Sequence, residues 1–229
     1  MSNTDSTSTF LSRRSAMAAG AFGVPLATLA SMASARDDHN HGDAAGPVST
    51  KLGKVLGATH NGTTHTLPPL PYAYDAVSPN IDELTMELHH GKHHNGYVNG
   101  LNKTIETLAK VSRGEAEGSM YELQRNLSFN YAGHVLHSIF WATMGPDDNG
   151  NMGGAPQGTL AEAMNASFGS FDNFKTQFAA AGKSVKGSGW VMLLLDPIAG
   201  SLHISTANEH DVYFPAGAIP LLPCDVWEH

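Results

Sequence analysis

Between Ser78 and Met144, apolar residues recur at helical rather than strand spacing. The spacing predicts a helix that begins near Ser78-Pro79, because proline is tolerated in the first helical turn. Gly91 and Gly96 interrupt this run and predict a kink or a close packing contact. A second helix is predicted from about Ser119 to Met144. The apolar positions of the first run are Ile81, Leu84, Leu88, Tyr97, Val98, Leu101, Ile105 and Leu108.

The pattern changes in the second half of the chain. Residues 159–168 and 170–181 predict two short helices, and Ser170 with Asn173 is a candidate cap region. Residues 189–195 form a compact apolar run, which a turn separates from the β-type segment 202–206. Helices followed by a small antiparallel sheet are typical of the α+β class.

Two segments precede the predicted fold. Residues 1–35 have the features of an export signal, with Arg13-Arg14 before an alanine-rich apolar stretch and an A-x-A cleavage site at 33–35. The paired arginines favour the twin-arginine route, and a general secretory signal is the alternative. Residues 36–66 are rich in Gly, Asp, His, Thr and Asn and lack periodicity, which predicts a flexible linker.

Composition and charge exclude several classes of function. The formal net charge of -8 disfavours nucleic acid as a partner, because its phosphates would be repelled. The sequence lacks an uninterrupted, strongly apolar run of the roughly 18 residues that a membrane span requires, so no stable span is expected. Cys224 is the single cysteine, which rules out a disulfide within one chain. The count of 13 histidines stands out, since histidine is the commonest metal ligand.

The histidines cluster in places with metal-ligand chemistry. On a helix, His89, His93 and Tyr97 lie on one face, while His90 and His94 form a neighbouring stripe, and the two stripes are not expected to face the core equally. Three further places carry similar chemistry. They are the pair His134 and His137, the segment 208–211 and the D-x-x-x-H pair of Asp225 and His229. Oxygen and nitrogen donors without thiolate suit Fe, Mn or Zn, so spacing alone predicts a mononuclear metal site.

Several motifs occur together in a characteristic order. They are LPPLPYAYDA, HHGKHHNGYVNGLN, HSIFW, SFGSFDNFK, GSGW and DVWEH. In order and spacing, residues 67–229 resemble the iron/manganese superoxide dismutases. The resemblance implies an α+β fold: an N-terminal helical hairpin, at 67–150, followed by an α/β domain with a three-stranded antiparallel sheet, at 151–229.

The resemblance also implies a site and a reaction. One Fe or Mn ion per chain would be held by His89, His137, Asp225 and His229. Tyr97 and His93 would line the substrate funnel, and His210 would hydrogen-bond the metal-bound solvent. The substrate would be superoxide, converted to dioxygen and hydrogen peroxide by a homodimer or homotetramer. With the export signal, a periplasmic or extracellular location is expected.

The sequence departs from the family at three points. Gly133 stands where iron-type members often carry glutamine, and His210 occurs with either metal, so Fe and Mn both remain open. Leu136 replaces a usual asparagine. The chain ends at His229, whereas family members continue with a helical tail, so we expect an incomplete sequence. The alternative function is an exported, dimeric metal-binding protein that has lost catalysis; a zinc hydrolase is disfavoured, because the sequence contains no H-E-x-x-H motif.

Overall fold

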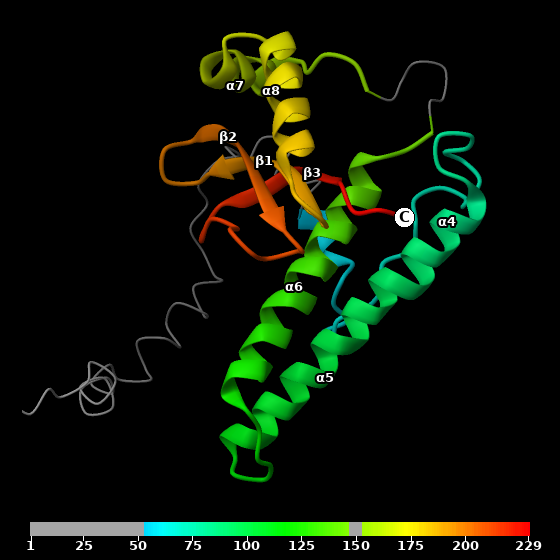
Figure 1. The fold of residues 1–229 in the computed structure, drawn as a ribbon, viewed down its shortest axis with the longest axis vertical. Helices are drawn as coiled ribbons and strands as arrows, with labels where there is room; N and C mark the ends of the chain where they lie inside the picture. The colour runs from blue at the N-terminus through cyan, green and yellow to red at the C-terminus, as the bar shows by residue number, and fades with distance from the viewer. Residues whose placement is uncertain (1–52, 147–152) are drawn as a thin grey trace, which may run out of the picture. The chain divides into compact units, whose positions relative to one another are not determined.

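A computed structural model describes residues 53–146 and 153–229 (Figure 1). The proposed export signal and residues 36–52 of the predicted linker lie outside these ranges. None of the helices in the described ranges has both the length and the apolar character needed to cross a membrane. The elements run in the order α4 (Glu83–Leu88), η1 (His89–His94), α5 (Asn95–Ser112), α6 (Met120–Thr143), α7 (Gly158–Phe168), α8 (Phe171–Ser184), β1 (Gly189–Asp196), β2 (Ser201–Asn208) and β3 (Ile219–Asp225).

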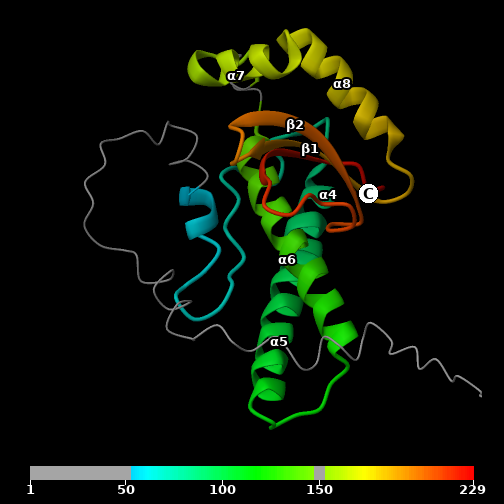
Figure 2. The ribbon, with the colours of Figure 1, turned by 90° about the vertical axis from the view of Figure 1, so that its left-hand side faces the viewer.

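The helical part is a hairpin in which α5 and α6 lie side by side (Figures 1 and 2). Helix α6 matches its predicted range, and the Ser119 side chain caps its first turn by accepting a hydrogen bond from the Glu122 N–H. The predicted start of the first helix is wrong by several residues. Asp82 caps α4 through the Thr85 N–H at 2.9 Å, so the helix begins at Glu83 rather than near Ser78-Pro79.

The segment between α4 and α5 is a π-helix, η1. Hydrogen bonds in a π-helix join residues five apart, so its side chains follow a wider turn than in an α-helix. In this segment His89, His90 and His94 are buried, while His93 is exposed. The two histidine stripes therefore do not face the core equally, as expected: both members of the His90 and His94 stripe are buried, whereas the other stripe has His89 buried and His93 exposed.

The sheet has the order β2-β1-β3, and both pairs are antiparallel. The central strand β1 is covered on both faces, which explains its continuous apolar sequence. On one face Trp190, Met192 and Leu194 pack against Leu136 of α6. On the other face Leu193 packs in a cluster with residues of α7 and α8, so the sheet lies between two helical layers (Figure 2).

Residues 53–66 differ from the predicted flexible linker, because they are folded against the helices. His60 and His65 form an antiparallel bridge around a turn at Asn61 and Gly62. The side-chain amide of Asn102 in α5 bonds to both the backbone N–H and the C=O of His65, at 2.9 Å each. This segment therefore belongs to the folded part of the molecule.

Candidate metal centre

Four separate parts of the fold bring the candidate residues to one small cavity. The π-helix and the start of α5 supply His89, His93 and Tyr97, and α6 supplies His137. The end of β3 and the residues after it supply Asp225 and His229, and the turn after β2 supplies His210. All of these residues line a single cavity of about 140 Å³, with Trp227 and Glu228 as the remaining walls.

Three of the four predicted ligands converge closely. One donor atom each from His89, His137 and Asp225 lies within 4.8 Å of the other two. The two Nε2 atoms of His89 and His137 are 3.0 Å apart, and His89 Nε2 lies 3.3 Å from Asp225 Oδ2. His229 is outside this close group, although its Nε2 lies 3.2 Å from the same carboxylate oxygen. His229 is also the most open of the four, with 28% of its side chain exposed.

The orientation of His137 is fixed by its far ring nitrogen. Its Nδ1–H donates to the Gly133 carbonyl oxygen at 2.7 Å, and a neutral imidazole with a proton on Nδ1 carries a lone pair on Nε2. That lone pair faces the cavity. Burial lowers the pKa of His137 well below its ordinary value and also lowers the pKa of His89, so both rings favour the neutral form that binds metals.

Asp225 supplies the negative charge of the cavity. Burial alone would raise the pKa of its carboxyl group, but contacts with His229, His89 and the Trp227 N–H outweigh burial and hold the pKa well below its usual range. The Trp227 N–H donates to Oδ1 at 2.8 Å. Oδ2 is buried and makes no well-formed hydrogen bond with any described residue, although two imidazoles lie close to it.

This donor set fits a resident Fe or Mn ion. A buried, ionised carboxylate oxygen that lacks a proper hydrogen bond is costly unless a cation compensates it. Facing imidazole nitrogens are likewise unfavourable when both carry lone pairs, and a shared metal ion removes that conflict. Imidazole and carboxylate donors without thiolate suit Fe, Mn and Zn. His89, His137 and Asp225 would hold the ion, with His229 as a fourth ligand.

His210 lies beside the candidate ligands without belonging to them. Its Nδ1 accepts a hydrogen bond from the indole N–H of Trp190 at 2.9 Å. Since indole only donates, the proton of neutral His210 sits on Nε2. Burial lowers the pKa of His210 to about 4, which keeps the ring neutral. This Nε2 is buried and has no hydrogen-bond partner among the described residues, so it is free to donate to a species bound in the cavity.

Tyr97 and His93 also line the cavity. The Tyr97 ring lies edge-on to His210, with 4.6 Å between ring centroids, and 5.2 Å from the centroid of His137. Burial, together with the negative charge of Asp225, raises the pKa of Tyr97 to about 12, so its phenol stays protonated at neutral pH. His93 is exposed and reaches the same cavity from the solvent side.

The other buried histidines have different roles. His90 donates from Nε2 to the Pro68 carbonyl oxygen at 2.9 Å and accepts at Nδ1 from the Tyr74 hydroxyl at 3.1 Å. His94 accepts at Nδ1 from the Trp141 indole and hydrogen-bonds through Nε2 to His134 Nδ1. These ring nitrogens are all committed to protein partners, so His90 and His94 are not available as ligands.

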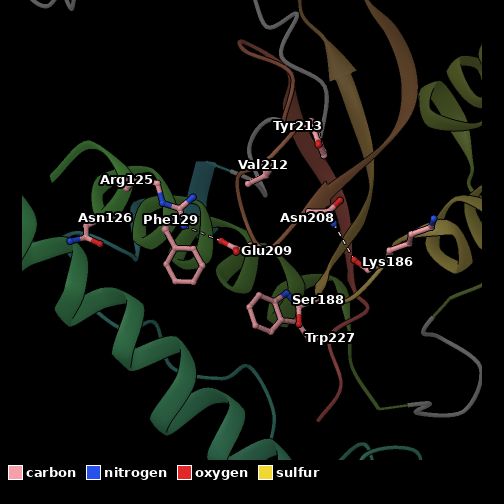
Figure 3. A pocket seen from close by; sticks show the side chains of 10 residues that line it. All are labelled: Arg125, Asn126, Phe129, Lys186, Ser188, Asn208, Glu209, Val212, Tyr213 and Trp227. Atoms are coloured by element: carbon pink, nitrogen blue, oxygen red, sulfur yellow. Dashed lines mark hydrogen bonds and ion pairs between the residues drawn. The ribbon is translucent and has the colours of Figure 1, made fainter. Parts of the chain in front are cut away.

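A larger cavity adjoins the site without containing it. Figure 3 shows this cavity of about 760 Å³, where Arg125 meets Glu209 at 3.4 Å and the Asn208 amide donates to the Lys186 carbonyl at 3.1 Å. Trp227 is the one residue that lines both cavities. None of the predicted site residues lines the larger cavity, so size does not identify the chemical site.

Sequence reasoning assigned no hydrogen bond to Trp190 and no role to Phe129 in this site. Trp190 sets the proton of His210, and the Phe129 ring lies 4.7 Å from His210 and 5.7 Å from Tyr97, between centroids. The GSGW motif marked Trp190 as a family position. Its pairing with His210, however, depends on the β1–β2 register and on the turn after β2, and short-range spacing does not specify either of them.

Fold and site together are typical of a metalloprotein that binds one ion through nitrogen and oxygen ligands. The ion site lies between a helical hairpin and a three-stranded sheet. Residues 64–145 match the family model described as iron/manganese superoxide dismutases, alpha-hairpin domain, and residues 156–229 match the C-terminal domain of the same family. The chain belongs to the iron/manganese superoxide dismutase family.

Relatives of known name agree with this membership. Over 165 residues, or 72% of this chain, it is 46% identical to superoxide dismutase (Mn/Fe) of Aeropyrum pernix, covering 76% of that protein. Over the same length it is 48% identical to superoxide dismutase (Fe) of Pyrobaculum aerophilum, covering 77% of it. It is 44% identical to superoxide dismutase (Mn/Fe) of Propionibacterium freudenreichii, with 81% of that protein covered. The relatives' names include both metals.

Proposed function

We propose that this protein converts superoxide to dioxygen and hydrogen peroxide at one Fe or Mn ion, held by His89, His137, Asp225 and His229. One observation carries the proposal: in a chain of this family, imidazole nitrogens and one ionised carboxylate oxygen meet in a small cavity of about 140 Å³. When bound, the ion supplies one-electron redox chemistry, by which one superoxide is oxidised to dioxygen and the next is reduced to peroxide.

The chain's own residues set the conditions for this chemistry. His137 and His89 are kept neutral by burial and present nitrogen lone pairs, while Asp225 contributes a fixed negative charge. The buried rings of Trp190 and Trp141 pack edge-on against His137 and His89, respectively. With a bound cation offsetting the negative charge of Asp225, a small cavity of this kind suits a small anion such as superoxide.

The reaction consumes two protons for each peroxide formed, and the cavity contains two groups able to hold them. Tyr97 keeps its phenolic proton at neutral pH, because its pKa is raised to about 12. His210 keeps a proton on Nε2, because Trp190 occupies its other nitrogen. Both groups are placed to donate hydrogen bonds to species in the cavity. Exposed His93 at the rim connects them to solvent.

The deciding experiment measures superoxide decay by the purified full chain loaded in parallel with Fe, Mn or Zn, together with the metal content of each sample. Fast decay with Fe or Mn, and none with Zn, is the expected result, and it also identifies the working metal. Stable Fe or Mn content without any decay would overturn the enzymatic proposal in favour of a metal-binding protein that has lost catalysis.

Two histidine variants separate ligands from structural residues. His137→Ala removes a cavity-facing lone pair and should abolish metal retention. His90→Ala removes a buried ring that bonds only to Pro68 and Tyr74, so it should lower stability and leave the metal content of the folded protein intact. Equal metal content in the two folded variants would contradict the ligand assignment.

Export and assembly complete the proposal. The Arg13-Arg14 pair before an alanine-rich stretch supports twin-arginine export to the periplasm or beyond. The homodimer or homotetramer is proposed because the motifs resemble those of the family. Replacing both arginines with lysine should retain the protein inside the producing cell, as cell fractionation would show. Light scattering of the purified protein measures its oligomeric state, and a monomer would contradict the proposed assembly.

A further inference from the structure

The folded segment 58–66 forms a small β-hairpin whose first part, residues 58–63, precedes the family match, which begins at residue 64. Asn61 Oδ1 accepts hydrogen bonds from the N–H groups of Thr63 and Thr64, and Gly62 adopts the left-handed region with φ of 92°. The Thr66 N–H closes the hairpin on the Thr59 carbonyl at 2.8 Å. The segment therefore has a defined conformation of its own.

The hairpin is held to α5 by one side chain. Asn102 accepts from the His65 N–H and donates to the His65 carbonyl, both at 2.9 Å, as a neighbouring strand would. This clamp places the His65 ring edge-on to His134, with 5.4 Å between centroids. It also places the Thr59 carbonyl within reach of His134 Nε2, at the long hydrogen-bond distance of 3.4 Å.

A chain of hydrogen bonds with a fixed direction runs from the interior outward to the hairpin. The Trp141 indole N–H donates to His94 Nδ1 at 3.0 Å, so the proton of His94 lies on Nε2 and is donated to His134 Nδ1 at 2.8 Å. The proton of His134 must then lie on Nε2, which leaves the Thr59 carbonyl as the final acceptor. Each ring has one tautomer, and the hairpin supplies the last partner in the chain.

The chain touches the candidate metal centre through ring packing. The His94 ring is fully buried and stacks on His137, with 5.3 Å between centroids and 26° between planes. His137 is anchored on its other side by the Gly133 carbonyl. The plane of this candidate ligand is therefore set between α6 backbone and His94, whose own position depends on His134.

We propose that the 58–66 hairpin is a positioning element of the metal centre, acting through His134 and His94 on the orientation of His137. The proposal rests on the proposed function in that His137 is taken as a metal ligand. Asn102 and His134 are then positioning residues, although neither touches the cavity. Loosening the hairpin should weaken metal retention without removing any ligand.

The test compares Asn102→Ala and His134→Asn with wild type. Asn102→Ala releases the hairpin and leaves every histidine in place. In His134→Asn, the amide oxygen can accept from His94 as Nδ1 does, but the donation to Thr59 is lost. As a control, Asn130→Ala removes an amide on α6 whose hydrogen bond is local, to the Asn126 carbonyl.

The measured quantity is the rate of Fe or Mn release to a chelator. Partners that bond directly to a ligand typically change metal affinity by about 10- to 100-fold, so a more remote effect of roughly 3- to 10-fold faster release is expected for both variants. If both act through one chain, the double variant should release metal no faster than the more affected single variant, whereas independent effects would multiply. Asn130→Ala should match wild type.

Two further readouts make each outcome decisive. Amide exchange at the His65 N–H reports whether Asn102→Ala has loosened the hairpin. In the metal-free protein, nitrogen spectra of labelled histidines report the His134, His94 and His137 rings, so the inference is decided even if wild type fails to retain Fe or Mn. A loosened hairpin with unchanged His137 signals, or with a wild-type rate of metal release, would overturn the proposal.

Discussion

Gly133 is a position where adding one methyl group should disturb the centre measurably. A Cβ at this residue would lie 2.9 Å from Tyr97 Cγ and 3.1 Å from Cδ1 and Cδ2, against about 3.5–4.0 Å for an ordinary carbon contact. The ring must therefore retreat by roughly half an ångström to reach ordinary contact. Its centroid is only 4.6 Å from that of His210 and 5.7 Å from that of Phe129, so little space exists behind it.

Two effects of Gly133→Ala oppose one another. Alanine in place of glycine within a helix gains about 1 kcal/mol through the smaller entropy of the unfolded chain. Overpacking in a well-filled interior costs about 1–3 kcal/mol. Since the Tyr97 ring is hemmed in, we expect the cost near the upper end and a net destabilisation of about 1–2 kcal/mol. That corresponds to a melting temperature lower by about 3–6 °C.

Gly96→Ala is a control of opposite sign in the same part of the molecule. Gly96 lies in α5, and a Cβ there would meet nothing within 4 Å. This variant should be more stable than wild type by about 0.5–1 kcal/mol. Urea unfolding of the metal-free proteins, followed by tryptophan fluorescence and circular dichroism, measures both changes. A Gly133→Ala protein as stable as Gly96→Ala would refute the idea that Tyr97 is confined against α6.

Three further predictions concern buried polar groups and the sheet. Burial lowers the pKa of His134 and of His210 from 6.5 to about 4, so between these pH values the unfolded chain binds more protons than the folded one. The metal-free protein should therefore lose stability as the pH falls from 6.5 towards 4, and urea unfolding midpoints would measure the loss. Trp190→Phe leaves His210 Nδ1 without its donor, at a cost of about 1–3 kcal/mol, and nitrogen spectra of His210 should show mixed tautomers. In Gly189→Ala the new Cβ would overlap the Ala207 carbonyl oxygen, so circular dichroism should show loss of the folded sheet, whereas native-like spectra would contradict the close β1–β2 packing.

Local signals in the sequence predicted much of the fold correctly. The candidate cap at Ser170 and Asn173 is confirmed. The helix predicted to begin near Ser119 does so, and Ser119 is its cap residue. The continuous apolar run of β1 likewise follows from burial on both faces. The four candidate ligands were chosen by resemblance to the family. That choice did not require knowing which distant parts of the chain come together in the fold. The structure places all four residues around one cavity.

Features that depend on a change of helical geometry were not predictable from periodicity. The run from Ile81 to Leu108 was treated as α-helix throughout. The structure instead has a π-helix, η1, at His89–His94, in which His89, His90 and His94 are buried. Gly91 and Gly96 were interpreted as marking a kink or a close packing contact; Gly91 lies inside the π-helix and Gly96 lies in α5, so the pattern did not identify the π-helix.

The sequence of the hairpin at 58–66 contains a turn signal that was not used, because the composition of the segment resembles that of a linker. Asn61-Gly62 is a typical turn pair, with glycine at the position that needs positive φ. It was overlooked because Gly, Asn and Thr are also the residues of flexible linkers. The contacts that hold this hairpin come from Asn102 and His134, far along the chain, and only the folded structure brings them together.

Two histidines present different chemical groups to the cavity, because the ring nitrogen that faces away from it has a different hydrogen-bond partner in each. A backbone carbonyl accepts only, so at His137 the Gly133 carbonyl holds the proton on Nδ1 and leaves a lone pair facing the cavity. An indole donates only, so at His210 Trp190 forces the proton onto Nε2 and leaves an N–H facing the cavity. One imidazole is thereby suited to bind a cation and the other to donate a hydrogen bond beside it. The difference arises from the α6 backbone and from β1, rather than from the histidines themselves.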